Sequence, residues 1–362
     1  MFRPADEVPA GSVLRADICI AGGGAAGITL ARELRGSGAS VILLESGGFD
    51  PDPDDQALYT ARSSGDRYDP LATRLRYLGG ATNHWSGWCR PIDPLHFEPR
   101  GWIANSGWPI SRSDLDPYYA RAAKVCELPP SFGDSTAGDR GDNEGVDRWF
   151  QSLFEDDAIT STEYWFSPPT RFGSRYRDDL ELSSETTAYL RANLVNVANS
   201  DGRVTQFEVA TLDGNNFAVE AGAYVIALGG IENARMLLAS RDSSPAGLGN
   251  DGGLVGRYFM DHFDQTMGTM LLTSPIDGAY QPGRLDQRRA AITLTPAAQR
   301  EHEIGGIALV VESFPFWKPD EADYKTVRAN DAADILRGLA GGTSVPYSLQ
   351  VAPSRSRTRR AG

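Results

Sequence analysis

One stretch of the chain, RYLGGATNHWSGWCRP, combines residue types that can do chemistry. Its adjacent glycines, Gly79 and Gly80, would let the backbone approach a bound molecule closely. His84 follows within the same loop, between an asparagine and a tryptophan, and an imidazole at such a place can bond to a ligand. The alternative is a histidine that only hydrogen-bonds within a protein core. The stretch therefore raises the question of what needs a Gly-Gly turn followed by a histidine and two large aromatic residues.

A second glycine pattern lies nearer the start, in AGGGAAG, where Gly22, Gly24 and Gly27 form G-x-G-x-x-G. Each glycine has a distinct physical role in a dinucleotide-binding loop. Gly22 allows the tight turn, Gly24 lets the backbone approach a pyrophosphate, and Gly27 lets helix and strand pack closely. The N–H groups and dipole of the following helix would then face the phosphates.

The elements around these glycines support that interpretation. Ile18 and Ile20 alternate as in a buried strand, and a second strand, Val41 to Leu44, ends at Glu45. Glu45 stands where an acid accepts hydrogen bonds from the ribose hydroxyls, and its charge disfavours a 2′-phosphate. We expect an acid there, at the polar end of a strand, to contribute little to the core. A glycine-rich turn in an unrelated α/β protein is the alternative.

A third segment, AYVIALGGIENARMLLAS, predicts a strand from Tyr224 to Leu228 and a helix from about Ile231. Short strands with turns at Asp-Gly pairs precede it, so we expect a meander that returns to a parallel sheet. More than a hundred residues of loop-rich sequence separate this unit from the first one. That insertion favours a flavoprotein over a nicotinamide-dependent dehydrogenase, whose first unit normally continues into further strand–helix repeats.

Composition limits the class of protein. The chain has 362 residues, of which 41% are hydrophobic and 23% charged, the proportions of one large globular domain or two ordinary ones. A net charge of −13 argues against binding to nucleic acid or to an anionic membrane. The start has no secretory pattern, no apolar run is long enough to cross a membrane, and three scattered cysteines form neither a disulfide framework nor a zinc site. We expect a reduced, cytoplasmic protein without a metal.

Taken together, these segments resemble the glucose–methanol–choline (GMC) oxidoreductases, particularly their pyranose-oxidase-like, sugar-oxidase branch. The resemblance rests on the first glycine unit, RYLGGATNHWSGW, YVIALGGIENARMLL and GLVGRYFMDHF, and it extends to about Trp317. It implies an α/β fold (α+β overall), in which a Rossmann-like FAD-binding domain is joined to an incomplete antiparallel-sheet substrate domain.

The resemblance also implies FAD as the cofactor. The Gly-Gly loop would run along it, with Trp85 and Trp88 walling the pocket. Some branches link the flavin covalently to the sixth residue of the loop, here His84, whereas others bind it non-covalently, and both remain open. The cofactor-binding positions that the resemblance implies are Gly22, Gly24, Ala26, Gly27, Glu45, Gly79, Gly80, Asn83, His84, Val197 and Gly229.

For the domain organisation, we expect a discontinuous FAD-binding domain over residues 1–110 and 187–262. Residues 111–186 would form a loop-rich insert that covers the active site. Three strand-like runs, Gln265–Leu272, Ala290–Leu294 and Gly306–Glu312, would open a partial substrate-binding domain over 263–345. The arginine-rich residues 346–362 would form a disordered basic tail, from a truncated reading frame or as a natural tail.

The family's chemistry is hydride transfer from a CH–OH group to flavin N5 while a histidine, paired with His or Asn in a C-terminal segment, takes the hydroxyl proton. None of the four histidines of this chain lies in such a segment, so no catalytic residue is identified. We expect an alcohol or sugar substrate, oxygen or a redox partner as electron acceptor, and an oligomer as one option. A chain truncated in this way would be weakly active or inactive alone. A non-catalytic FAD-binding remnant and an NAD(P)-dependent dehydrogenase are the alternative functions.

Overall fold

The computed structural model describes residues 1–64, 68–129, 132, 157–261, 265–272, 288–313 and 345–353. Within these residues the chain forms two compact units. Of the described residues, the first contains those of Met1–Trp85 and Pro169–Phe259, and the second contains those of Ser86–Pro168 and Met260–Arg359. No helix among the described residues is both long and apolar enough to cross a membrane. The two units are described separately below.

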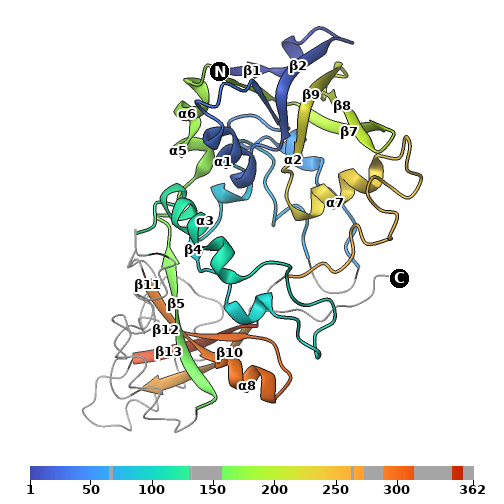
Figure 1. The fold of residues 1–362 in the computed structure, drawn as a ribbon. Coiled ribbons are helices and arrows are strands. Elements are labelled where there is room, and N and C mark those ends of the chain that lie inside the picture. Colours follow the sequence, from blue (N-terminus) through green and yellow to red (C-terminus); the bar gives the residue numbers. More distant parts are fainter. Residues whose placement is uncertain are drawn as a thin grey trace. The chain divides into compact units, whose positions relative to one another are not determined.

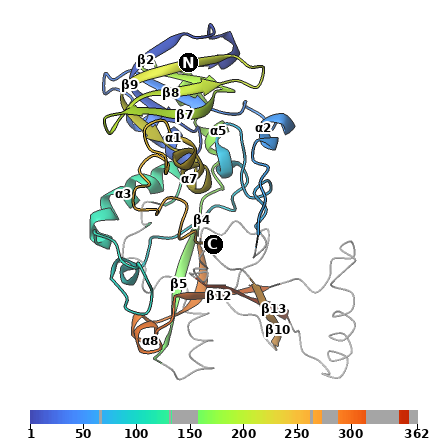
Figure 2. The ribbon, with the colours of Figure 1, turned by 90° about the vertical axis from the view of Figure 1, so that its right-hand side faces the viewer.

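The first unit is built on a seven-stranded sheet in the order β1-β6-β3-β2-β9-β8-β7 (Figure 1). Strands β1, β6, β3, β2 and β9 run parallel, whereas β9, β8 and β7 form an antiparallel meander (Figure 2). This arrangement confirms the expected return of a meander to a parallel sheet. The strands are β1 (Phe2–Pro4), β2 (Val13–Ala21), β3 (Val41–Glu45), β6 (Thr186–Leu190), β7 (Asn193–Ser200), β8 (Arg203–Ala210) and β9 (Asn216–Ile226).

Helices follow the parallel strands at the positions that the glycine motifs predict. Helix α1 (Ala25–Glu33) begins directly after the G-x-G turn, and its fully buried Ile28 and Ala31 pack against the sheet. Helix α7 (Gly230–Ala239) begins after β9 in the same way. Shorter helical elements complete this unit: η1 (Ala5–Glu7), α2 (Pro53–Ala57), η2 (Gly80–Asn83), α5 (Phe172–Arg175) and α6 (Arg177–Glu181).

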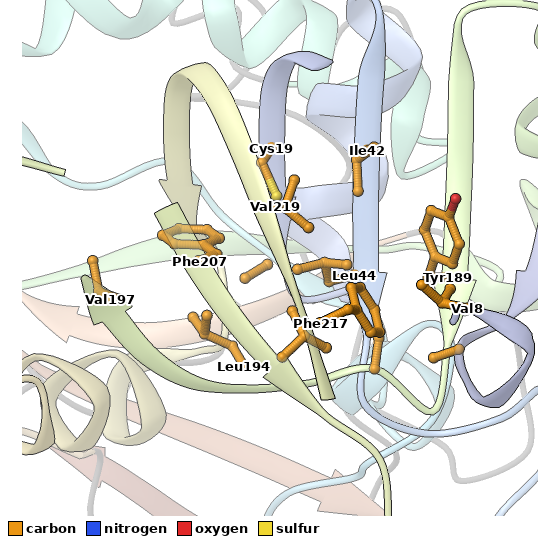
Figure 3. Close-up of a cluster of buried hydrophobic side chains, with 14 of the residues drawn as sticks. Val8, Cys19, Ile42, Leu44, Tyr189, Leu194, Val197, Phe207, Phe217 and Val219 are labelled. Carbon is orange, nitrogen blue, oxygen red and sulfur yellow. The ribbon is translucent and has the colours of Figure 1, made fainter. Parts of the chain in front are cut away.

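The core of the first unit forms where the meander meets the parallel strands (Figure 3). Phe207 and Val219 are fully buried and belong to the same cluster as Leu44 and Ile42 of β3. Burying such side chains contributes about 1.5–3 kcal/mol each. The sheet is therefore a stable frame from which the loops at its carboxyl edge are held.

The second unit contains a six-stranded antiparallel sheet in the order β10-β13-β12-β11-β5-β4. The three runs predicted as substrate-domain strands are confirmed as β10, β11 and β12, which supports the expected fold class. The elements are β4 (Trp88–Cys89), η3 (Pro94–Phe97), α3 (Arg112–Val125), β5 (Ile159–Phe166), β10 (Gln265–Leu272), β11 (Arg288–Leu294), α8 (Pro296–Glu301), β12 (Ile307–Ser313) and β13 (Val345–Pro353).

The expected disordered tail over 346–362 is wrong in its first part. Strand β13 pairs antiparallel with β10 on one side and with β12 on the other. Tyr347, Leu349 and Val351 alternate with smaller or polar residues, and this period of two is typical of a strand. The nearby arginines and prolines obscured that pattern. Residues 354–362 lie outside the described part of the chain.

The expected domain boundaries also differ from the structure. Residues 86–110, expected in the FAD-binding domain, belong to the second unit. The insert 111–186 is not a single loop-rich region. Helix α3 occupies part of it behind a capping box of Ser111 and Asp114, and β5 joins the second sheet, whereas α5 and α6 belong to the first unit. The glycine-rich stretch STAGDRGDNEGVD and His262 lie outside the described residues.

Candidate dinucleotide site

The three glycines of the first motif have the three environments that the sequence predicts. Gly22 has a φ of +110°, and a Cβ there would lie 2.3 Å from the carbonyl oxygen of Ala227. A Cβ on Gly27 would lie 1.9 Å from the carbonyl oxygen of Gly22, so helix and turn are packed backbone to backbone. Gly24 differs, because nothing lies within 4 Å of its Cβ position. The open space above Gly24 is where a ligand could approach the backbone.

The start of α1 presents unpaired backbone donors beside this open space. Gly24 is the N-cap of the helix, and its carbonyl oxygen accepts from the N–H of Ile28 at 2.9 Å. The first N–H groups of a helix have no partner within the helix, and Ala25 and Ala26 are exposed. Such an end attracts anionic groups through its N–H groups and its dipole. The expected position Ala26 is therefore where a phosphate could be bound.

Glu45 ends β3 directly beside the glycine turn. Its Oε2 accepts from the N–H of Gly23 at 2.7 Å, and its Oε1 accepts from the N–H of Gly47 at 2.8 Å. Burial raises the pKa of this carboxyl, against the two backbone N–H groups, the charge of Arg76 and the hydroxyl of Ser46, which lower it.

Glu45 is only 5% exposed, so the expectation that it contributes little to the fold is wrong. Its removal would leave two backbone donors without their acceptor. Oε1 also accepts from the hydroxyl of Ser46 at 3.3 Å, so Oε2 is the carboxylate oxygen with a second lone pair that can accept from a ligand hydroxyl.

The Gly79-Gly80 loop docks onto the first motif through the backbone. The N–H of Gly79 donates to the carbonyl oxygen of Gly23 at 2.7 Å, and the N–H of Leu78 donates to that of Gly48 at 3.0 Å. A Cβ on Gly80 would lie 3.3 Å from the Cα of Gly24. The structure thus brings the two glycine motifs, far apart in sequence, into direct contact.

His84 lies at the end of η2, in the loop that this docking fixes. Its N–H donates to the carbonyl oxygen of Ala81 at 3.1 Å, and its exposed imidazole meets the ring of Tyr77 edge-on, with 6.5 Å between centroids. The expected cofactor position Asn83 bonds back to the loop, with Nδ2 2.9 Å from the carbonyl oxygen of Leu78.

An open groove of about 400 Å³ runs past His84 and Tyr77. Its lining is mostly apolar, with side chains from the start of α2 and from the segment that leads into the Gly-Gly loop. The lining residues are Pro51, Asp52, Pro53, Gln56, Leu71, Ala72, Leu75, Tyr77 and His84. A mostly apolar groove with a few polar groups is typical of cofactor sites.

The second glycine pair closes the same end of the sheet. Gly229 has a φ of +90° and is the N-cap of α7, and the N–H of Leu228 donates to the side-chain oxygen of Asn233 at 2.8 Å. The N–H of Ala227 donates to the carbonyl oxygen of Ala21 at 2.7 Å, which joins this turn to the end of β2. Gly229 therefore lies on a turn next to the first motif, as expected.

Val197 is not brought to the glycine loops. Its side chain is fully buried in the core with Phe207 (Figure 3), and its N–H donates to the hydroxyl of Ser240 at 3.0 Å. The residues that follow β6 lie beside the glycine loops instead. The N–H groups of Arg191 and Ala192 donate to the carbonyl oxygens of Gly47 and Glu45 at 3.1 and 2.9 Å.

The two tryptophans belong to different units. Trp85 belongs to the first unit, where its indole N–H donates to the carbonyl oxygen of Thr170 at 3.0 Å, and it does not line the groove beside His84. Trp88 belongs to the second unit and packs edge-on against Tyr164 and Phe166. That the two tryptophans wall a cofactor pocket stays a prediction.

Two arginines that precede the Gly-Gly loop have structural roles that the sequence analysis did not predict. Arg74 pairs with the buried Glu232 at 2.7 Å and stacks over Tyr59, with 4.0 Å from its Cζ to the ring centroid. Arg76 is buried against the same ring, and its Nη2 donates to Asn193 at 3.0 Å. The spacing of two arginines on one side of the motif, RLRYLGG, was the available signal. Their contacts join the loop to α7 and to the start of β7.

The fold and these contacts define an α/β protein whose first unit is a Rossmann-like sheet with glycine loops at one end. No family model matches the chain. It is 24% identical over 322 residues to 2-methyl-1,2-propanediol dehydrogenase of Mycolicibacterium austroafricanum, covering 72% of this chain and 58% of that protein. It is 26% identical over 291 residues to paromamine 6'-oxidase of Streptomyces fradiae, covering 67% of this chain and 52% of that protein.

Among solved structures, the chain is similar to pyridoxine 4-oxidase from Mesorbium loti, with a TM-score of 0.48 and 16% identity over 93% of this chain and 71% of that one. These relatives fit the GMC oxidoreductases that the chain resembles in sequence. It spans a little over half the length of the curated relatives it matches.

Proposed function

We propose that this protein is an FAD-dependent oxidoreductase that oxidises the CH–OH group of an alcohol or sugar. The observation that carries the proposal is the hydrogen bond from Gly79 to Gly23, which joins the dinucleotide loop to the loop of His84. A cofactor bound at the first loop would therefore also lie beside the second, which suits FAD, the cofactor that the resemblance implies.

The residues of the first unit fit FAD in several respects. The N–H groups at the start of α1 and the open space above Gly24 suit a pyrophosphate. Glu45 suits a ribose hydroxyl, because it is held in place by two backbone N–H groups and its Oε2 keeps a lone pair. When bound, FAD would accept the hydride from the substrate carbon. The chain's own residues would hold the cofactor, and the groove beside His84 would exclude water from part of it.

His84 is the candidate for a covalent bond to the flavin. Among the described residues of the first unit it is the single histidine, and its imidazole is exposed at the groove. The cofactor positions Gly22, Gly24, Ala26, Gly27, Glu45, Gly79, Gly80, Asn83, His84 and Gly229 lie on loops that hydrogen bonds and close backbone contacts link together. We keep these positions in the proposal and replace Val197 with the segment after β6.

The substrate class is supported by the names of the relatives. One is a dehydrogenase of a diol and the other an oxidase of paromamine. The described residues supply no assigned base for the hydroxyl proton, and lack of general base catalysis slows such a reaction by about 10²–10⁴. An assay on this chain must therefore follow single turnovers over hours.

The test is anaerobic flavin reduction. The protein is loaded with FAD and mixed with primary alcohols, diols, aldoses and glycosides, and the flavin absorbance is followed. We expect slow bleaching with at least one of these compounds, and recovery of the colour when oxygen or an artificial acceptor is added. A flavin that stays oxidised with every compound, yet is bleached by dithionite, would overturn the proposed CH–OH oxidation.

A further inference from the structure

We propose that Arg171 is a positioning residue that fixes the loop of His84. Its Nη1 donates to the carbonyl oxygen of Thr82 at 3.1 Å and to that of Trp85 at 2.8 Å. These two carbonyl groups flank Asn83 and His84 in the chain. One guanidinium nitrogen therefore holds both ends of the short segment that carries the imidazole.

Of the two carbonyl groups that Arg171 binds, that of Thr82 lies in the last turn of η2, and that of Trp85 lies just beyond the helix. The short helix η2 ends at Asn83, and the last carbonyl groups of a helix have no N–H from the next turn. A cation at this end also interacts favourably with the helix dipole. Hydrogen bonds from a charged donor are stronger than neutral ones, so the contact can hold a loop that is otherwise exposed.

Neighbours of Arg171 hold the same loop at three further points. The carbonyl oxygen of Thr170 accepts from the indole N–H of Trp85 at 3.0 Å, and the N–H of Phe172 donates to the hydroxyl of Thr82 at 3.3 Å. A Cβ on Gly173 would lie 2.1 Å from the carbonyl oxygen of Leu78, so the two backbones are in close contact. The segment TRFG was expected as part of an active-site cover, and it instead clamps the Gly-Gly loop.

The positive charge of Arg171 also acts on the aromatic partner of His84. Burial raises the pKa of Tyr77, whereas the charge of Arg171 and a hydrogen bond with Asn83 lower it. The guanidinium is thus close enough to the Tyr77–His84 pair for its charge to matter. Removing it would free the loop and alter the electrostatic environment of this end of the groove.

The orienting role toward a flavin rests on the proposed function, but the clamp itself does not. The first experiment therefore uses the cofactor-free chain. Hydrogen exchange of the peptide that contains His84 and Trp85 is compared in the wild type, Arg171→Met and Arg171→Lys. Arg203→Met is the matched control, because Arg203 is an exposed arginine of the same unit.

In Arg171→Met we expect amide exchange in this peptide to become about tenfold faster or more, as two charged hydrogen bonds are lost. Arg171→Lys should recover part of the protection, since an ammonium can still donate to carbonyl groups. Arg203→Met should match the wild type. Unchanged exchange in Arg171→Met, or an equal increase over the whole first unit, would overturn the positioning role.

The second experiment measures the circular dichroism of the flavin band in FAD-loaded protein. The band should change in Arg171→Met and be partly restored in Arg171→Lys. An unchanged band in Arg171→Met, with faster exchange in the cofactor-free chain, would overturn the orienting role alone. If the wild type binds no FAD, the proposed function fails while the exchange result still decides the clamp.

Discussion

The backbone N–H of Gly79 lies 2.7 Å from the carbonyl oxygen of Gly23, and this contact joins two motifs that are 56 residues apart. A side chain at either glycine would disturb it, because a Cβ on Gly23 would lie 2.8 Å from Oε2 of Glu45 and one on Gly79 would lie 2.6 Å from the side-chain oxygen of Asn83. Gly23 in turn donates to Glu45, so the acid, the dinucleotide loop and the Gly-Gly loop form one hydrogen-bonded chain. A ligand bound at one of these loops would therefore affect the other loop through these hydrogen bonds.

The Gly79 position should tolerate no side chain. Gly79 has a φ of +100°, and a Cβ there would lie 2.6 Å from both the side-chain oxygen of Asn83 and the N–H of Gly173. We expect Gly79→Ala to lower the free energy of unfolding by about 2–4 kcal/mol, from backbone strain and the clash together. Gly214→Ala is the matched control, because Gly214 has a φ of +92° and nothing within 4 Å. Urea unfolding that gives equal losses for the two variants would contradict the docking of the loops.

The glycines of the first motif should separate into packing and binding roles. A Cβ on Gly27 would lie 1.9 Å from the carbonyl oxygen of Gly22, so Gly27→Ala should cost about 3 kcal/mol or more. Gly24 has a φ of −87° and open space above it, so Gly24→Ala should change stability by less than about 1 kcal/mol. Thermal unfolding of the cofactor-free variants measures this difference. Similar melting temperatures for Gly27→Ala and Gly24→Ala would show that Gly27 is not packed against the carbonyl oxygen of Gly22.

Glu45 should make the stability of the first unit depend on pH. Burial, the largest cause, raises the pKa of this carboxyl in the folded chain above its ordinary value of 4.5. The folded state therefore binds the proton more tightly than the unfolded chain does. The stabilisation from this protonation is complete at low pH and is lost as the pH rises through the raised pKa of the folded state.

The variant Glu45→Gln cannot titrate at this position, and its amide keeps only one of the two hydrogen bonds to Gly23 and Gly47. The difference in unfolding free energy between this variant and the wild type should shift in favour of the variant as the pH rises above 4.5. A difference that is independent of pH, or that shifts the other way, would show that Glu45 is not desolvated.

The His84 assignment is tested by acid precipitation of the FAD-loaded protein. If flavin colour stays with the polypeptide, His84→Ala should release it completely to the supernatant, because His84 is the single histidine among the described residues of this unit. His96→Ala, in the second unit, is the control and should leave the bond intact. Flavin released from the unmutated protein would show that His84 is a neighbour of the cofactor without a bond to it.

The parts of the fold that could be predicted from the sequence are those set by local patterns. The glycines, the alternating strands and the acid at Glu45 follow from the geometry of one strand–turn–helix unit, and the structure has them where the sequence placed them. Contacts between segments that are distant in the chain have no local pattern in the sequence from which they could be predicted. The clamp of Arg171 on Thr82 joins residues 89 positions apart, and β13 depends on partners on both sides. Val197 was misplaced because the strand registers decide which residue after β6 reaches the site.

The central claim, that the two docked glycine loops form an FAD site, is tested most directly by titrating the cofactor-free protein with FAD. The account predicts saturable binding of one FAD per chain, and binding at least about tenfold weaker in Gly24→Val, whose side chain would fill the open space above the turn. Retained FAD is measured by its absorbance after ultrafiltration, and the folding of the variant is checked by its thermal unfolding. Absence of saturable FAD binding to the wild type, or equal binding to folded Gly24→Val, would contradict the claim.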